Sequence, residues 1–152
     1  MDSFVTVELE IRATKAQVTG TASLAQNAVH WLWPTPQVAN IAGDRELPDG
    51  TRQVIVADGD KLRDKVVSSE DGSVIIESEF RPRKDEVPGR KMKYELSVEP
   101  GHGTAIAKLG LSFMDRENPA AASEVRRWRR HAEQCLRRLS GLAAPERDDD
   151  AS

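Results

Sequence analysis

The chain has 152 residues, of which 38% are hydrophobic and 31% are charged. This length suits one domain with a single core, and no apolar run approaches the ~18 residues that a membrane span needs. The lone cysteine, Cys135, excludes an internal disulfide and a cysteine-based metal cluster. Asp2 stands where a secretory signal carries basic residues and no apolar block follows, so we expect no signal peptide and a cytoplasmic protein.

Charge is unevenly distributed along the chain, whose formal net charge is −3. Residues 123–138 hold six arginines against two glutamates, whereas residues 143–152 are predicted to form a disordered acidic tail. A basic helix on an acidic body is not typical of nucleic-acid binders, so we expect no nucleic-acid partner. We interpret these arginines as the solvated side of an amphipathic helix, and the alternative is a docking site for an acidic partner.

The N-terminal third of the chain predicts one strand and two short helices. Strict alternation of apolar and polar residues over 4–12 is typical of a half-buried strand. Thr14 and Gln17 have the spacing of a capping box, which predicts that a helix begins there. A second helical stretch over 23–33 ends at Pro34, which cannot continue a helix.

Six further strands and a long helix are predicted in the remainder. Turn-forming Pro, Asp and Gly residues divide the central region into β-rich segments. These segments are 38–46, 51–56, 61–69, 73–81, 90–99 and 104–114. Pro119 should open a helix of about twenty residues that ends at Gly141, a residue suited to the position after a helix. Its apolar face should pack on the sheet and comprises Val125, Trp128, Ala132, Cys135, Leu136 and Leu139.

Turn chemistry also predicts the strand register. Three-residue loops that end in Gly59 and Gly72 place apolar residues opposite one another, whereas a two-residue turn would shift the register by one. This register brings Arg52, Asp64 and Ser78 side by side on an otherwise apolar face. Buried polar groups need partners, so Arg52 and Asp64 form either a structural ion pair or, with Ser78, the polar end of a ligand site.

The last hairpin is predicted to have a four-residue loop over 100–103. Val98 would then face Ala105, and Tyr94 would face Leu109. This pairing keeps one face of the hairpin apolar and brings the Tyr94 hydroxyl onto it.

Four short motifs at strand ends and turns carry a family resemblance. They are Val5-Thr-Val-Glu-Leu-Glu-Ile-Arg-Ala13, Leu47-Pro-Asp-Gly-Thr-Arg52, Asp58-Gly59 with Asp64-Lys65-Val66, and Val98-Glu-Pro-Gly-His-Gly-Thr104. With the predicted element order, they resemble the START-like (SRPBCC) superfamily in its polyketide cyclase/dehydrase-like branch. The resemblance covers about residues 4–141 of the chain. One departure is Val18-Thr19-Gly20, because such chains usually carry a large aromatic residue after this valine.

The resemblance implies an α+β helix-grip fold over residues 1–142. A curved antiparallel sheet of about seven strands would wrap around the long C-terminal helix, with two short helices after the first strand. In relatives the cavity between sheet and helix takes hydrophobic ligands such as lipids, sterols, polyketides or hormones. Fold membership alone does not settle function, since some members are enzymes and others are not.

Recognised catalytic motifs are absent from the sequence. It contains no hydrolase elbow, P-loop, dinucleotide fingerprint or metal-spaced histidine pair, so we expect no cofactor and no metal. We expect His102 to be exposed in a turn and Cys135 to be an inert core thiol. His131 should lie at the edge of the last helix, and His30 beside Trp31 should help to cover the pocket entrance.

Three functions remain open at this point. The leading hypothesis is a binding module for a small, mostly hydrophobic ligand that is lipid, aromatic or polyketide-like. Its expected lining is His30, Trp31, Trp33, Val54, Leu62, Ile76, Ser78, Phe80, Met92, Leu109 and Trp128. The second is a cyclase or dehydratase-type enzyme, with Asp64 as proton carrier and Arg52 or Tyr94 binding the developing oxyanion.

The third hypothesis is a protein-interaction module that uses the arginine-rich last helix. A homodimer or another protein partner is left open. A pocket of a few hundred Å³ favours the first two functions, whereas a filled interior favours the third.

Overall fold

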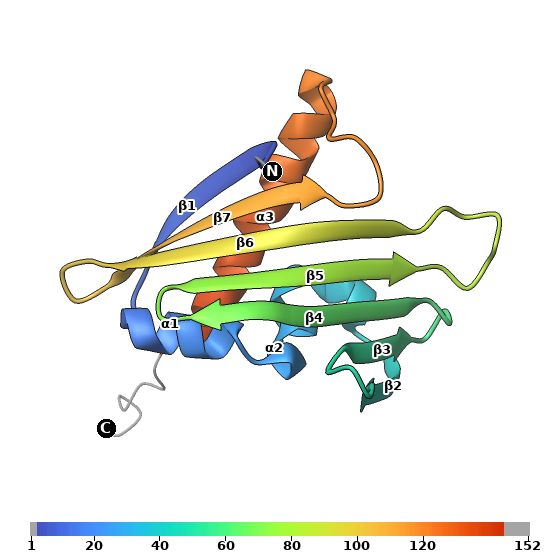
Figure 1. The fold of residues 1–152 in the computed structure, drawn as a ribbon, viewed down its shortest axis with the longest axis horizontal. Helices are drawn as coiled ribbons and strands as arrows, with labels where there is room; N and C mark the ends of the chain where they lie inside the picture. Colours follow the sequence, from blue (N-terminus) through green and yellow to red (C-terminus); the bar gives the residue numbers. More distant parts are fainter. Residues whose placement is uncertain (1–2, 145–152) are drawn as a thin grey trace.

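A computed structural model describes residues 3–144. The elements are β1 (Val5–Ile11), α1 (Lys15–Ala22), α2 (Ala25–Leu32), a 3₁₀ helix (Thr35–Val38), β2 (Ile41–Glu46), β3 (Arg52–Val56), β4 (Lys61–Glu70), β5 (Ser73–Arg81), β6 (Arg90–Pro100), β7 (Ala105–Phe113) and α3 (Ala122–Ala143). The strands form one antiparallel sheet in the order β1-β7-β6-β5-β4-β3-β2. In Figure 1 the strands β5 and β6 cross over α3. This arrangement confirms the predicted α+β helix-grip fold.

The first short helix begins at the residues that the sequence predicts. The Gln17 N–H donates to Thr14 Oγ1 at 3.0 Å, and the Thr14 N–H donates to Gln17 Oε1 at 2.8 Å, so the predicted capping box is formed. The next predicted strand begins three residues late, at Ile41, because a proline-containing 3₁₀ turn occupies Thr35–Val38.

The hairpin between β3 and β4 has the predicted register. The Val56 N–H donates to the Asp60 carbonyl at 3.0 Å, and Gly59 adopts a positive φ of 92° at the last loop position. Arg52 therefore lies directly opposite Asp64. A left-handed conformation of this kind favours glycine.

The hairpin between β4 and β5 turns differently from the prediction. Glu70 pairs with Ser73, so the loop has two residues and the expected three-residue loop is wrong. A β-bulge at Val67 then absorbs the one-residue shift, and Asp64 faces Ser78 as predicted. Because one face of these strands is buried, the pairing between Lys61 and Val66 on β4 and their partners on β5 keeps the predicted register. The extra residue of the bulge is Val67, whose side chain is exposed.

The hairpin between β6 and β7 is offset by two residues from the prediction. Pro100 pairs with Ala105, so Tyr94 lies opposite Leu111 instead of Leu109. The Gly101 N–H donates to the Thr104 carbonyl at 2.8 Å and closes the loop one residue later than expected. Because side chains alternate with a period of two, this offset leaves Tyr94 on the predicted face.

The long helix α3 starts and ends later than predicted. It begins at Ala122 instead of Pro119 and continues through Gly141 to Ala143, so Gly141 is not the residue after the helix. Leu139 and Ala143 are both buried, and their packing extends the helix beyond the glycine. Ala143, assigned to the tail in the prediction, is helical, and the rest of the predicted acidic tail beyond Ala144 lies outside the described residues.

The buried face of α3 matches the prediction. Trp128, Ala132, Cys135, Leu136 and Leu139 are all buried, and Val125 packs against them while partly exposed. The helix therefore presents one apolar face to the sheet. Among the described residues, no helix combines the length and the apolar character required to cross a membrane.

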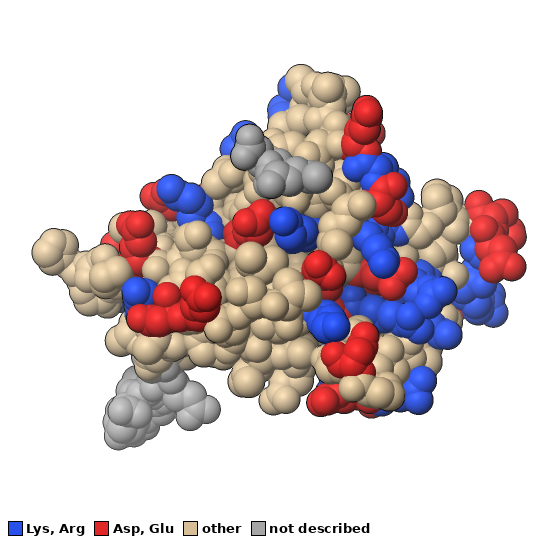
Figure 2. Space-filling model, in the orientation of Figure 1, with Lys and Arg blue, Asp and Glu red and all other residues tan. Residues whose placement is uncertain are grey.

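The outer face of the sheet is covered by paired charges. Across β4, β5 and β6, Arg63 faces Glu79, Lys65 faces Glu77, and Glu79 faces Lys91. Figure 2 shows these two signs of charge intermixed over this part of the surface. Opposite charges on neighbouring strands stabilise a solvated sheet face, so we assign this face a structural role.

Candidate functional site

A buried carboxylate lies between the sheet and α2. Asp64 of β4 is only 1% exposed. Its carboxylate accepts a hydrogen bond from the Ser78 hydroxyl at 2.6 Å and from Trp33 Nε1 at 2.9 and 3.1 Å to its two oxygens. Burial raises the pKa of Asp64 to about 6, although both hydrogen bonds act in the opposite direction. Trp33 reaches Asp64 because it directly follows α2, which ends at Leu32.

Arg52 does not join this carboxylate, although their backbones are paired. The Arg52 Nε instead donates to Asp44 on the neighbouring β2 at 2.6 Å, so the predicted Arg52–Asp64 ion pair is wrong. The Arg52 side chain remains 27% exposed, and a partner at the sheet edge spares the guanidinium the free-energy cost of full desolvation. Within residues 3–144, no lysine or arginine forms an ion pair with Asp64.

A second polar cluster connects β6 to α3. The Tyr94 hydroxyl lies 2.8 Å from His131 Nε2, which in turn lies 3.5 Å from Cys135 Sγ. Burial lowers the pKa of His131 to about 4, and nearby Arg138 and Arg90 add to this effect. Burial also raises the pKa of Tyr94 well above its usual value and that of Cys135 to about 12. All three groups are therefore uncharged at neutral pH.

His131 is half-buried, which agrees with its expected place at the edge of the helix, but its contacts were not predicted. Its imidazole packs edge-on against the indole of Trp128, with ring centroids 5.4 Å apart. The spacing held a usable signal, because His131 follows Trp128 by three residues and precedes Cys135 by four. Residues at these separations share one face of a helix.

Arg90 is a second residue that the interpretation missed. Its guanidinium carbon lies 5.0 Å from the centre of the Trp128 ring, 5.7 Å from that of Phe80 and 5.9 Å from that of Trp33. Such distances are those of cation–π contacts. The usable signal was the alternation of side chains along a strand, because Arg90 lies two residues before Met92 and so shares its inward face.

A pocket of about 310 Å³ opens beside Arg90 at one end of the helix grip. Its lining comes from β5, β6, β7, α3 and the loops that join them. The lining residues are Phe80, Pro88, Gly89, Arg90, Phe113, Arg116, Glu117, Pro119, Glu124, Arg127 and Trp128. We call this space the mouth pocket. Its aromatic walls include Phe113 and Trp128, whose rings meet edge to face at 5.4 Å.

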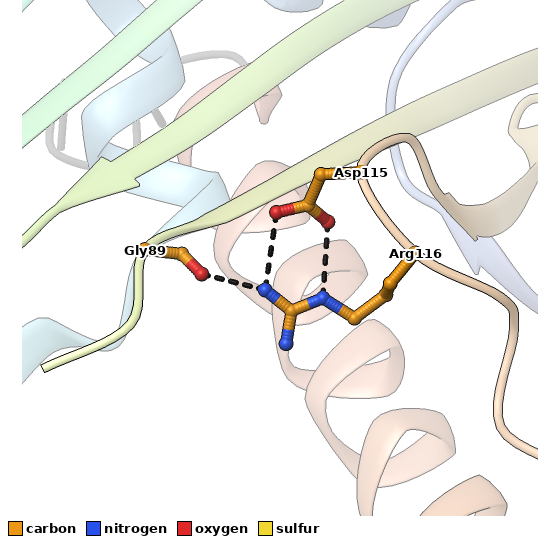
Figure 3. A network of polar contacts seen from close by, with 3 residues as sticks. All are labelled: Gly89, Asp115 and Arg116. Carbon is orange, nitrogen blue, oxygen red and sulfur yellow. Dashed lines mark hydrogen bonds and ion pairs between the residues drawn. The ribbon is translucent and has the colours of Figure 1, made fainter.

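One rim of the mouth pocket is held by a hydrogen-bond network around Arg116 (Figure 3). The Arg116 Nε and Nη2 each lie 3.0 Å from an oxygen of Asp115, and Nη2 also donates to the Gly89 carbonyl at 2.6 Å. Gly89 immediately precedes β6, so this network ties the start of β6 to the segment between β7 and α3. The Nε and Nη2 donors of Arg116 are thereby used within the protein.

The expected ligand-binding residues divide into two groups. Phe80, half-buried, and Trp128, buried, line the mouth pocket. The others, apart from His30, are buried in the interior: Trp31, Trp33, Val54, Leu62, Ile76, Ser78, Met92 and Leu109. His30 is exposed. His102 is exposed and Cys135 buried, as predicted.

Solved structures with the same fold share little sequence with this chain. XoxI from Bacillus cereus aligns with a TM-score of 0.61 at 14% identity, over 93% of this chain and 95% of that one. A START superfamily protein from Mycobacterium smegmatis aligns with a TM-score of 0.50 at 16% identity, over 92% and 93% of the two chains. The chain has the START-like fold.

A truncated norcoclaurine synthase from Thalictrum flavum has this START-like fold too, with a TM-score of 0.59 at 13% identity over 94% of each chain. No protein-family model and no curated protein sequence matches the chain significantly. The likeness therefore establishes the fold, and function has to be argued from the site.

Proposed function

We propose that this protein binds a small, mostly hydrophobic ligand in the mouth pocket of its START-like fold. The observation that supports this function is a concave space of about 310 Å³ walled by Phe80, Phe113 and Trp128. Ligand sites are typically concavities of roughly this size or larger, lined by aromatic side chains with a few polar groups. The apolar part of the ligand packs against these rings.

Phe80→Ala tests the ligand site with decan-1-ol as the probe. We expect about tenfold weaker binding by calorimetry, because losing contact with a half-buried phenyl ring removes about 1.5 kcal/mol of apolar burial. Phe80 is only half-buried, so the variant is expected to fold. The control is Val67→Ala, an exposed apolar residue on β4 outside the mouth pocket. An unchanged Kd in Phe80→Ala, or no saturable binding to wild type, contradicts this function.

The properties of Asp64 favour a second candidate function, proton transfer on a bound carbonyl compound. A carboxyl group with a pKa of about 6 exchanges protons readily near neutral pH. For this reaction the substrate must reach past the mouth pocket, whose lining contains neither residue, so that Asp64 carries the proton and the Tyr94 hydroxyl donates to the developing oxyanion. Arg52 has no part in it, because its guanidinium is engaged by Asp44. Norcoclaurine synthase, by its name, shows that this fold can carry a synthase.

Deuterium exchange tests this second function directly. We expect wild type to accelerate exchange of the acidic C–H of 2-tetralone in D₂O, observed by NMR, and Asp64→Asn to remove about 10²-fold or more of that rate. Asp85→Asn makes the same chemical change at an exposed residue and should have no effect. Wild type at the rate of buffer alone, or Asp64→Asn at the rate of wild type, contradicts proton transfer.

A further inference from the structure

Arg90 occupies an unusual position for a cation. It pairs with Phe80 at the start of β6 and lies on the inward face of the sheet. Aromatic rings from three separate segments surround its guanidinium group, namely those of Trp33, Phe80 and Trp128. These rings contact a guanidinium through its faces, which leaves the N–H donors at its edges to find acceptors elsewhere.

Those donors have no acceptor in the part of the chain that the structure describes. Every salt bridge and side-chain hydrogen bond of residues 3–144 involves other groups. A guanidinium carries five N–H donors. Arg90 is half-buried, and its nitrogens are not among the fully buried polar atoms that lack a partner, so these donors face water at the pocket and are open to a ligand. Partial burial lowers the pKa of Arg90, and the charges of Arg116 and Arg127 act in the same direction, against the effect of Tyr94.

The lining of the mouth pocket holds charges of both signs. Arg116 and Arg127 line it with Arg90, and the Arg127 guanidinium lies 5.5 Å from the centre of the Trp128 ring. The two acidic residues of the lining, Glu117 and Glu124, are exposed, and neither forms an ion pair with Arg90. Arg116 is paired with Asp115, so Arg90 is the half-buried cation of the lining whose donors have no partner in the described residues. A cationic ligand would be repelled by Arg90, and a neutral ligand would accept weaker hydrogen bonds from it than an anion does.

We propose that the ligand is an amphipathic carboxylate whose head group is bound by Arg90 at the mouth pocket, an inference that rests on the proposed ligand-binding function. A planar carboxylate matches the fork of guanidinium donors and accepts two parallel hydrogen bonds. The apolar tail lies along Phe80 and Trp128, and the head group supplies the acceptor that Arg90 lacks. Arg90 thus selects acids over alcohols of the same length.

Decanoate and decan-1-ol test this selectivity, because they share a ten-carbon chain and differ in head group. We expect wild type to bind decanoate at least tenfold more tightly than decan-1-ol at 0.15 M salt, from charge-assisted hydrogen bonding. Arg90→Met keeps a long apolar side chain between the rings and should abolish this preference while retaining decan-1-ol binding. The matched control is Arg126→Met, an exposed arginine of α3 outside the pocket lining, which should keep the preference.

Each outcome decides between the two proposals. Equal affinity for acid and alcohol in wild type, or a preference that survives in Arg90→Met, overturns the carboxylate assignment and leaves the hydrophobic-ligand function standing. If neither decanoate nor decan-1-ol shows saturable binding, both the carboxylate assignment and the hydrophobic-ligand function are overturned. Should Arg90→Met not fold, the Arg90 Nε–H signal of wild type decides by NMR, because decanoate should shift it and decan-1-ol should not.

Discussion

Replacing Asp64 by asparagine is expected to stabilise the fold at pH 8 by about 2 kcal/mol. The carboxyl group has a pKa of about 6 in the folded chain against an ordinary value of 3.8. Each unit of difference corresponds to about 1.4 kcal/mol, so the buried charge costs roughly 3 kcal/mol. An asparagine removes the charge, and its amide can still accept from Trp33 and donate to Ser78, although its hydrogen bonds are weaker.

The pH dependence of this effect has a definite sign. Because the folded pKa of Asp64 is raised, folding is favoured while the group is protonated, and this advantage is lost as pH rises from about 4 through 6. The stability gap between Asp64→Asn and wild type should therefore be small near pH 4 and complete above pH 7. Other groups, His131 included, titrate alike in both proteins and cancel from the comparison.

Urea unfolding at pH 4, 6 and 8 measures this gap. The exposed Asp85→Asn serves as control and should change the free energy of unfolding by less than about 0.5 kcal/mol at each pH. A lower stability of Asp64→Asn at pH 8, or a gap that does not vary with pH, contradicts the assignment of a buried carboxylate that lacks a cationic partner.

Replacing Trp33 by phenylalanine is expected to destabilise the fold by about 3 kcal/mol at pH 8. The change removes the indole N–H that donates to Asp64, and a hydrogen bond to a charged group contributes about 1.5–3 kcal/mol. Loss of part of a buried ring adds about 1 kcal/mol. The cost should fall by about 1 kcal/mol or more in an Asp64→Asn background, because the acceptor is then uncharged.

Trp31 provides a matched control for this double-mutant cycle. It is fully buried like Trp33, and its Nε1 has no hydrogen-bond partner within the described residues. Trp31→Phe should therefore show the packing loss alone and no coupling to Asp64→Asn. If Trp33→Phe costs no more than Trp31→Phe, or if its effect is additive with that of Asp64→Asn, the indole–carboxylate bond has no special energetic role.

Local patterns of the sequence were sufficient to predict most of the fold. Alternation and the Asp58-Gly59 turn place Arg52 opposite Asp64, because both depend on residues close together in the chain. The bulge at Val67 was not predicted, since a two-residue turn and a bulge together give the same inner register as the expected three-residue loop. The two-residue offset of the β6–β7 hairpin was not predicted for a related reason, because either register leaves the same face apolar.

The site itself was only partly predictable. Strand pairing correctly placed Ser78 beside Asp64, whereas the partner of Arg52 depends on Asp44, in a strand whose register the sequence left open. The bond from Trp33 to Asp64 spans 31 residues, and it forms only when α2 packs against the sheet. Arg90 directly follows the polar residues 82–89 that join two predicted strands, and nothing local indicates that three aromatic rings surround it.

The central claim is that the mouth pocket binds apolar molecules, and chemical-shift mapping of wild type with decan-1-ol tests it most directly. We expect saturable shifts of the aromatic signals of Phe80, Phe113 and Trp128, which line the pocket. We expect no shifts at the exposed arginines Arg126 and Arg130 of α3. Shifts confined to those arginines, or none anywhere, would contradict it and favour an acidic protein partner for α3.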